Sequence, residues 1–218
     1  MISNNCRLQF ITHYTEKYSY IDTARMALEG GCRWIQLRMK DAGSSLMEDT
    51  AIVIQKMCKD YGATFIVDDH VLLAKKINAD GVHLGKNDMP IAEARKTLGN
   101  SFIIGDTVNS FEDILNTLQS ATPDYFGCGP FRFTATKKNL APILGYEGYR
   151  TIVKKMKNMN INIPLIGIGG IERSYIPILL ESGVNGIALS SSILKALNPV
   201  KEMRDIVKMM YKEREITN

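Results

Sequence analysis

The sequence predicts an α/β fold, a single-domain (β/α)8 TIM barrel, on three observations. Short apolar runs of strand length alternate with amphipathic segments of helix length along the 218-residue chain. No linker rich in Pro, Gly or Ser interrupts the alternation, so residues 1–218 are expected to form one catalytic domain. Polar clusters follow nearly every apolar run, as expected when all the loops meet at one rim. A doubly wound sheet is the structural alternative, but it usually has fewer strands and a single crevice.

Four strand–helix units are expected in the first half of the chain. The strands are short apolar runs, at Leu8–Thr12, Trp34–Leu37, Phe65–Val67 and Gly81–Leu84. Each run is followed by a segment with apolar residues at helical spacing, at Asp22–Glu29, Leu46–Lys59, Val71–Lys76 and Ile91–Thr97.

Four more units follow in the second half. The expected strands are Phe102–Ile104, Tyr125–Gly127, Pro164–Ile168 and Gly186–Leu189. The expected helices are Phe111–Gln119, Tyr149–Lys157, Tyr175–Glu181 and Pro199–Glu213. Eight such units in this length match a (β/α)8 barrel at the small end of its size range.

Composition and charge narrow the class of protein. With 45% hydrophobic residues and no apolar run near the roughly 18 residues that span a bilayer, a soluble protein without membrane contact is expected. The net charge of +4 and the scattered lysines favour anionic small molecules over nucleic acid. Four cysteines without a CxxC motif predict reduced thiols, no zinc site and a cytoplasmic protein. A homo-oligomer is compatible with the sequence, which carries no signal that decides the oligomeric state.

Three polar side chains at the end of the second expected strand point to the same side of the chain. Alternation places Gln36, Arg38 and Lys40 on the same side of the chain. Arg38 can hold a phosphate with two N–H groups, and Gln36 can both donate to and accept from a heterocycle. A salt bridge at the rim is the alternative interpretation, and a ligand site is favoured because inward polar groups need a partner.

Carboxylates follow the third and fourth expected strands. Asp68 and Asp69 come after one strand, and Asp88 lies in the loop after the other. Carboxylates on neighbouring loops can share Mg²⁺, which usually accepts one or two carboxylates and substrate phosphates. A helix N-cap is the alternative role for Asp68 or Asp69. His83, between two apolar residues, is interpreted as a hydrogen-bonded core residue rather than a catalyst.

A basic loop follows the sixth expected strand. It starts at Gly129-Pro130 and contains Thr134, Thr136, Lys137 and Lys138. Hydroxyls and ammonium groups suit an oligophosphate, although such a string alone is more often a solvated loop. Its place at the carboxyl end of a buried strand favours a binding site.

Loops near the end of the chain predict a second phosphate site. Gly167-Ile168-Gly169-Gly170 follows the seventh strand, and Ser190-Ser191-Ser192 follows the eighth. Many barrels bind phosphate with these two loops. Gly105-Asp106-Thr107 adds a hydroxyl near the rim after the fifth strand. With no activated nucleophile, the residues indicate a magnesium-dependent transfer from a diphosphate to a monophosphate substrate.

Six motifs, in order and at similar spacing over nearly the whole chain, carry a resemblance to a known family. They are Gln36-Leu37-Arg38-x-Lys40, Asp68-Asp69, Gly81-Val82-His83-Leu84-Gly85 with Asp88, Gly129-Pro130, Thr134-x-Thr136-Lys137-Lys138, and Ile168-Gly169-Gly170-Ile171. Together they make the chain similar to the thiamine-phosphate synthase family, which implies a TIM-barrel transferase of thiamine biosynthesis. Such an enzyme joins 4-amino-2-methyl-5-pyrimidinylmethyl diphosphate to 4-methyl-5-(2-phosphoethyl)thiazole and releases pyrophosphate. Magnesium assists departure of pyrophosphate, and the thiazole nitrogen captures the resulting carbocation.

The resemblance also implies roles for individual residues. Those that would hold the pyrimidine diphosphate are Gln36, Arg38, Lys40 and Asp68, with Thr107 near the leaving group. Those that would ligate Mg²⁺ are Asp69 and Asp88. Those that would hold the thiazole substrate and the departing pyrophosphate are Thr134, Thr136 and Lys137. Those that would receive the thiazole phosphate are Gly170, Ser190 and Ser191. The expected catalytic residues are Arg38, Thr107 and Lys137, since charge develops on pyrophosphate in the transition state.

The chain departs from the family pattern at three places. Asp68 replaces the usual Asn, which adds negative charge beside the expected metal. Asp106-Thr107 replaces a small apolar residue and a serine, so a further carboxylate is expected near the leaving group. Arg132-Phe133 replaces an aromatic residue and proline, which leaves the conformation of that loop open.

Three alternative functions remain open from the sequence. A thiazole tautomerase shares the barrel but needs neither the threonine–lysine loop nor the magnesium aspartates. A non-catalytic thiamine-phosphate-binding barrel would keep the phosphate sites without releasing pyrophosphate. Another phosphate-handling barrel, such as an isomerase, would share the glycine-rich phosphate site but not the polar residues after the second strand.

Overall fold

A computed structural model describes residues 6–40, 42–134 and 141–212, in which strands and helices alternate along the chain. The strands are β1 (Leu8–Ile11), β2 (Trp34–Leu37), β3 (Thr64–Asp68), β4 (Gly81–Leu84), β5 (Ile103–Val108), β6 (Tyr125–Cys128), β7 (Leu165–Ile168) and β8 (Gly186–Leu189). The helices are α1 (Tyr20–Glu29), α2 (Ser44–Asp60), α3 (Val71–Ile77), α4 (Ile91–Leu98), α5 (Phe111–Leu118), α6 (Gly145–Asn158), the 3₁₀ turn η1 (Arg173–Tyr175), α7 (Ile176–Glu181), α8 (Ser191–Leu194) and α9 (Pro199–Lys212).

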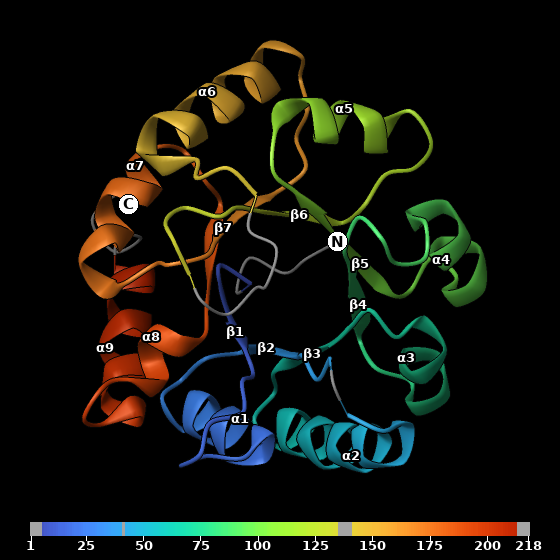
Figure 1. Cartoon of the computed structure of the whole chain (residues 1–218), viewed down its shortest axis with the longest axis vertical. Coiled ribbons are helices and arrows are strands. Elements are labelled where there is room, and N and C mark those ends of the chain that lie inside the picture. The colour runs from blue at the N-terminus through green and yellow to red at the C-terminus, as the bar shows by residue number, and fades with distance from the viewer. Residues whose placement is uncertain (1–5, 41, 135–140, 213–218) are drawn as a thin grey trace.

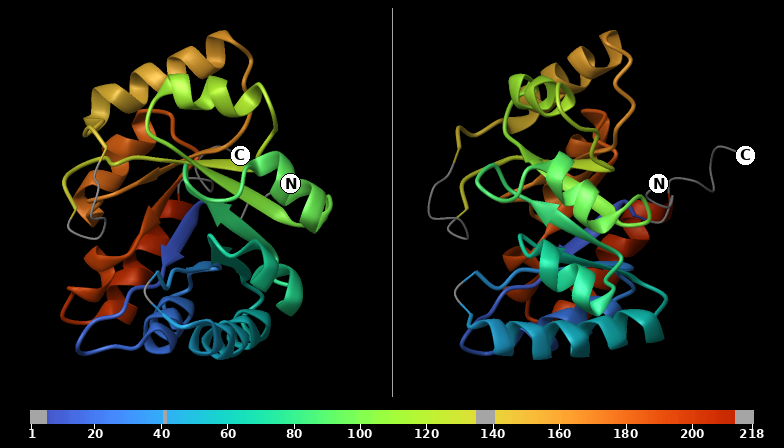
Figure 2. Two further views of the ribbon diagram at one scale, coloured as in Figure 1. Left: turned by 45° about the vertical axis from the view of Figure 1, so that its right-hand side comes forward. Right: turned by 90° about the vertical axis from the view of Figure 1, so that its right-hand side faces the viewer.

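The strands form a closed parallel barrel in the order β1 to β8, which confirms the predicted fold class. Each strand pairs with the next, and β1 closes the barrel by pairing with β8 through Leu8 and Ile187. Seen along the barrel, the strands lie at the centre and the helices form a ring outside them (Figure 1). The turned views show the same outer layer of helices around the strands (Figure 2).

Side-chain alternation along the strands divides the core into two parts. Residues such as Ile35, Phe65 and Ile104 face outward and pack in a large cluster with the helices. A smaller cluster fills the inside of the barrel and includes Trp34 and Tyr125, whose rings meet edge to face at 4.9 Å. The interior of the barrel is therefore filled by side chains, and a ligand can reach the strands only at the two ends of the barrel.

Local signals fix where several helices begin. Ser19 caps α1 and Ser110 caps α5, and in each capping box an aspartate three residues later bonds back to the cap. These boxes orient the helices after the loops that leave β1 and β5. Within the described residues, no helix is long and apolar enough to span a membrane.

The predicted boundaries agree with the structure within a few residues, with two differences. β5 runs on to Val108, so Gly105-Asp106-Thr107 belongs to the strand and not to a following loop. The short helix α8 follows β8 where only a serine cluster was expected. The prediction ended this strand too early because the polar residues Asp106 and Thr107 interrupt its apolar pattern, although Asp106 is buried.

Candidate active site

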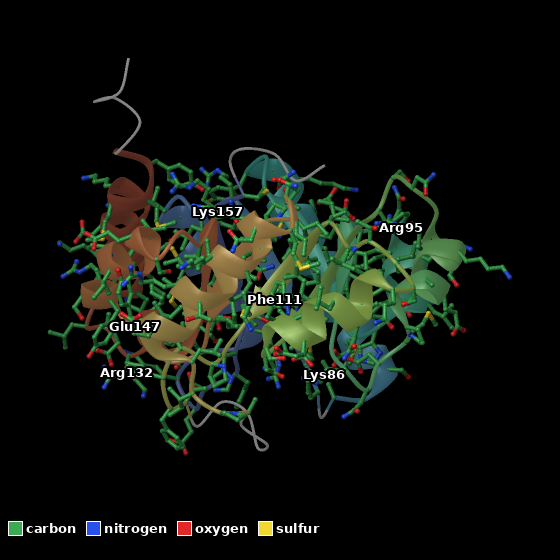
Figure 3. The ribbon with its side chains drawn as sticks, turned by 90° about the horizontal axis from the view of Figure 1, so that it is seen from above. Lys86, Arg95, Phe111, Arg132, Glu147 and Lys157 are labelled. Atoms are coloured by element: carbon green, nitrogen blue, oxygen red, sulfur yellow. The ribbon has the colours of Figure 1, made fainter. Side chains whose placement is uncertain are left out.

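Those predicted site residues that the structure describes lie at or just after the carboxyl ends of their strands. Figure 3 shows Lys86, Arg132 and Glu147 toward one end of the barrel and Arg95 and Lys157 toward the other. Glu147 lies in the first turn of α6. The end of the barrel that carries Glu147 is therefore the end at which the strands finish and the helices begin. Inward-facing positions of several strands reach this end, and their polar side chains meet there.

Gln36, Arg38 and Asp68 form one cluster inside this end. The Nε2 of Gln36 donates to Asp68 Oδ1 at 2.6 Å, and the Nε of Arg38 lies 3.5 Å from Asp68 Oδ2. Gln36 and Asp68 are buried, at 2% and 6% exposure. The Oε1 of Gln36 is buried without a hydrogen-bond partner among the described residues. Such an atom needs a donor, and a bound ligand can supply it.

Asp69 and Asp88 form a second cluster beside the first. Their carboxyl groups share a hydrogen bond, and Lys40 Nζ lies 3.0 Å from Asp69 Oδ2. The backbone N–H of Gly85 donates to Asp88 Oδ2 at 2.7 Å. Asp69 is held in the left-handed backbone region, at φ 63°, which aims its side chain across to the neighbouring loop.

The pKa values of the carboxyl groups of Asp69 and Asp88 are shifted in opposite directions. Burial and the bond with Asp69 raise the pKa of Asp88. Burial also raises the pKa of Asp69, but its bonds with Asp88 and Lys40 outweigh burial and leave that pKa lowered. Two adjacent carboxyl groups disfavour being ionised together, so the pair favours binding of a proton or a cation.

The alternative N-cap role for Asp68 or Asp69 is wrong. The cap position of α3 is His70, and its side chain makes no capping bond. Asp68 points into the barrel and Asp69 toward Asp88, so both aspartates remain available at the site. Within the described ranges no group of three or more His, Cys, Asp or Glu is placed to hold a metal.

His83 and Thr107 lie next to each other inside the barrel. The Nε2 of His83 is 2.9 Å from Thr107 Oγ1, and its Nδ1 is 3.0 Å from the hydroxyl of Tyr125. His83 is thus a buried, hydrogen-bonded residue, as expected from its apolar neighbours.

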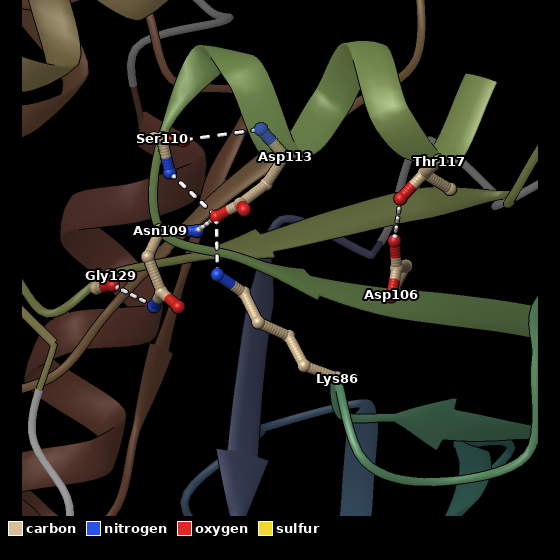
Figure 4. A network of polar contacts seen from close by, with 7 residues as sticks. All are labelled: Lys86, Asp106, Asn109, Ser110, Asp113, Thr117 and Gly129. Carbon is tan, nitrogen blue, oxygen red and sulfur yellow. Dashed lines mark hydrogen bonds and ion pairs between the residues drawn. The ribbon is translucent and has the colours of Figure 1, made fainter. Parts of the chain in front are cut away.

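The expectation that Asp106 lies near the leaving group is wrong. Its carboxylate faces outward from β5 and accepts from Thr117 of α5 at 2.6 Å (Figure 4). Burial raises the pKa of Asp106. Adjacent strand residues point to opposite faces, so Thr107 enters the barrel and Asp106 must face the helix.

Glycines after β7 bring two loops together. Gly170 has φ 67°, and a Cβ there would lie 2.7 Å from the carbonyl oxygen of Phe133. The loop after β6 bonds to this region, because the backbone N–H of Arg132 donates to Gly169 at 3.0 Å. Any larger residue at Gly170 would push the loops apart.

Ser190 and Ser191 lie where β8 meets α8. The hydroxyl of Ser190 is buried without a hydrogen-bond partner in the part of the chain that the structure describes. Ser190 precedes the first residue of α8, and Ser191 is that first residue. An unpaired buried hydroxyl next to backbone N–H groups suits an anion such as a phosphate.

The loop after β6 is held by neighbours as far as Thr134. The guanidinium of Arg132 bonds to the hydroxyl of Tyr175 and stacks on its ring at 4.6 Å. Asn109 donates to the carbonyl of Gly129 at 2.5 Å, next to the Lys86–Asp113 pair (Figure 4). Two of the predicted site residues, Thr136 and Lys137, lie outside the described residues.

Two residues after β1 belong to the site and were not predicted. Thr12 accepts at Oγ1 from the backbone N–H of Arg38 at 3.1 Å. Burial and the charge of Arg38 lower the pKa of His13. Thr12 and His13 could have been predicted from the sequence because they lie at the end of the first strand. Polar residues at the carboxyl ends of barrel strands are expected to line the active site, as was predicted for Gln36.

Comparisons with known proteins show which family the chain resembles. The family model for thiamine monophosphate synthase matches residues 8–193. The thiamine-phosphate synthase of Phocaeicola vulgatus is 59% identical and covers 96% of this chain and 100% of its own. That of Bacteroides thetaiotaomicron is 56% identical, with coverages of 93% and 96%. The solved thiamine phosphate pyrophosphorylase of Pyrococcus furiosus is 34% identical, with a TM-score of 0.82 over 95% of this chain and 98% of that one.

Proposed function

The chain belongs to the thiamine monophosphate synthase family, and from that premise we propose its reaction and the roles of its site residues. It is a transferase that joins 4-amino-2-methyl-5-pyrimidinylmethyl diphosphate to 4-methyl-5-(2-phosphoethyl)thiazole. The products are thiamine phosphate and pyrophosphate. The mechanism is dissociative and assisted by Mg²⁺.

The observation that carries the proposal is the Asp69–Asp88 pair. Two carboxylates within hydrogen-bond reach, one with a raised pKa, form an oxygen-rich site with excess negative charge. This donor set fits Mg²⁺, which takes one or two protein carboxylates and completes its ligands with water and phosphate oxygens. When bound, the ion neutralises charge on the diphosphate as it leaves.

Arg38, Lys40 and Thr107 hold the diphosphate in this proposal. Arg38 and Lys40 follow the end of β2, and each already pairs with an aspartate, which keeps its cation directed into the site. Additional N–H groups on both side chains can donate to phosphate oxygens. Gln36 holds the pyrimidine: Asp68 fixes its Nε2 as a donor, so its Oε1 can accept from the exocyclic amino group.

The thiazole phosphate binds at Gly170, Ser190 and Ser191. Ser190 supplies a buried hydroxyl without a partner among the described residues, and Gly170 gives the backbone room to approach. The family resemblance assigns Thr134, Thr136 and Lys137 to the thiazole substrate and the departing pyrophosphate, whose charge Lys137 would stabilise.

The reaction begins with cleavage of the bond between the pyrimidinylmethyl carbon and the diphosphate oxygen, which keeps the electron pair. The positive charge on that carbon is shared with the pyrimidine ring. The thiazole nitrogen then donates its lone pair to the carbon and forms the new bond. The site must exclude water at this stage, or water would capture the cation as an alcohol.

The partners are these small substrates, and neither nucleic acid nor a membrane is expected to take part. The net charge of +4 is modest, whereas nucleic-acid binding usually calls for a concentrated basic face. Four buried free cysteines suit the reducing cytoplasm. A thiazole tautomerase would not need the Asp69–Asp88 pair, and a non-catalytic binding barrel would release no pyrophosphate.

Pyrophosphate release by the purified chain tests the proposal. The chain is given Mg²⁺ and the pyrimidine diphosphate, with and without the thiazole phosphate. Pyrophosphate release matched by thiamine phosphate formation is the expected result. Tight binding of thiamine phosphate without any release would instead identify a binding protein or a tautomerase.

A further inference from the structure

Four polar side chains form a continuous hydrogen-bond chain inside the barrel. Gln9 Nε2 donates to the hydroxyl of Tyr125 at 3.3 Å. That hydroxyl lies 3.0 Å from His83 Nδ1, and His83 Nε2 lies 2.9 Å from Thr107 Oγ1. Gln9, Tyr125 and His83 are all buried, at 2%, 0% and 8% exposure. The chain runs from β1 through β6 and β4 to β5, and it ends at a residue of the active site.

The first donor favours one direction for the bonds in this chain. An amide NH₂ can only donate, so the Tyr125 oxygen accepts from Gln9, and this leaves its single hydrogen free to be donated to His83 Nδ1. Burial raises the pKa of Tyr125, so the phenol keeps that hydrogen. Because Nδ1 accepts, the neutral imidazole carries its hydrogen on Nε2 and donates it to Thr107. The Thr107 oxygen thus accepts from His83, and its own hydrogen points elsewhere.

We propose that His83 is a positioning residue: Gln9 and Tyr125 hold it as the Nε2–H tautomer, and it turns the hydroxyl hydrogen of Thr107 toward the leaving pyrophosphate. The inference rests on the proposed function, in which Thr107 lies beside the leaving group. A donor fixed in advance stabilises developing negative charge without reorganising during the reaction. The opposite tautomer would reverse the bond, and Thr107 would then present a lone pair to an anion.

The barrel leaves space for both rings by having glycine next to each. A Cβ at Gly105 would lie 2.2 Å from the Tyr125 ring. A Cβ at Gly127 would lie 2.8 Å from His83 Cε1. Both glycines occupy inward strand positions, where any side chain would displace one of the two rings. The position of the imidazole between Tyr125 and Thr107 is therefore built into three strands.

The tautomer can be measured directly by ¹⁵N NMR on the whole chain labelled with ¹⁵N-histidine. The His83 signals are assigned by their loss in the His83→Gln variant. The expected result is a protonated Nε2 and an unprotonated Nδ1. A proton on Nδ1 would overturn the proposal, whatever the activity of the chain. Pyrophosphate release by the unaltered chain tests the proposed function separately, before any variant is compared.

Two polar variants of His83 then test the consequence for Thr107. His83→Gln is long enough to place an amide N–H at Thr107, whereas His83→Asn stays near Tyr125 and falls short of Thr107. The single-turnover rate of pyrophosphate release should fall about 10- to 100-fold in His83→Asn, with the KM of both substrates within about threefold. His83→Gln should restore most of that rate. Equal losses in the two variants, or none in either, would mean that His83 serves packing alone and would overturn the proposal.

Discussion

The two ends of the barrel interior differ although they lie on the same strand faces. Toward the start of the strands the interior holds Trp34 and Ile66, which pack with Tyr125 and Ile166. Two residues closer to the carboxyl ends of these strands, the same inward faces carry Gln36 in β2 and Asp68 in β3. Trp34 and Ile66 pack against apolar neighbours. Gln36 and Asp68 instead form a hydrogen bond, and the Oε1 of Gln36 has no partner among the described residues and can accept from a ligand.

This difference assigns stability to one end and function to the other. The apolar end gains free energy from burial and close packing. The polar end brings the carboxyl groups of Asp69 and Asp88 together and leaves the Ser190 hydroxyl without a partner among the described residues, which costs stability in the free protein. Substitutions at the two ends should therefore separate activity from stability.

The largest expected effect is at the polar end. Asp69→Ala should lower turnover by at least about a thousandfold, because it removes half of the proposed Mg²⁺ site. The melting temperature should fall only slightly, because the lost ion pair with Lys40 is partly exposed. Steady-state pyrophosphate release and a thermal melt measure the two quantities. Asp49→Ala, an exposed carboxylate on α2, is the control; near-normal turnover in Asp69→Ala would refute the metal assignment.

Ile166→Ala should produce the reverse pattern at the apolar end. Ile166 is 1% exposed inside the barrel, and truncating it should lower the free energy of unfolding by about 2–5 kcal/mol. Urea unfolding measures this loss. Turnover well below the melting temperature should stay within about threefold of normal, and a large fall in turnover without loss of stability would contradict the division between the ends.

A smaller effect is expected for Asp68→Asn. The aspartate adds charge near the metal site, but Arg38 lies 3.5 Å from it and offsets part of that charge. The unaltered chain should bind Mg²⁺ about two- to fivefold more tightly than the variant. Calorimetric titration with Mg²⁺ checks this, and equal or weaker binding by the unaltered chain would refute it.

The smallest effect is expected on the outer face of β5. Asp106→Asn should leave turnover unchanged, because the side chain faces Thr117 and not the site. Burial raises the folded-state pKa of Asp106, so the unfolded chain loses this proton first as the pH rises. The unaltered chain thus loses stability relative to the variant from about pH 4 upward, until the raised pKa is passed. Urea unfolding at several pH values should reveal this divergence, whereas a difference independent of pH would contradict it.

The fold was predictable from the sequence because its signals are local and repeated. Apolar runs such as Trp34–Leu37 and Gly81–Leu84 match their strands residue for residue. The end of β5 was mistaken because Asp106 is polar yet buried against α5. Such a residue breaks the apolar pattern that marks strands, and its partner Thr117 lies on another element.

Site residues could be predicted only where a polar residue type coincided with a position at the end of a predicted strand. Gln36, Asp68 and Thr107 could be named from strand alternation and family resemblance. The Gln9–Tyr125–His83 bonds join three strands, and no spacing in the sequence indicates which residues meet there. The roles of Thr12 and His13 likewise depend on Arg38 from the neighbouring strand.

Calorimetric titration of the unaltered chain with inorganic pyrophosphate, with and without Mg²⁺, tests most directly whether the polar end is a metal-dependent diphosphate site. The account predicts binding with Mg²⁺ that weakens at least about tenfold without the ion and equally in Asp69→Asn with the ion present. Binding of the same strength in all three titrations would contradict it.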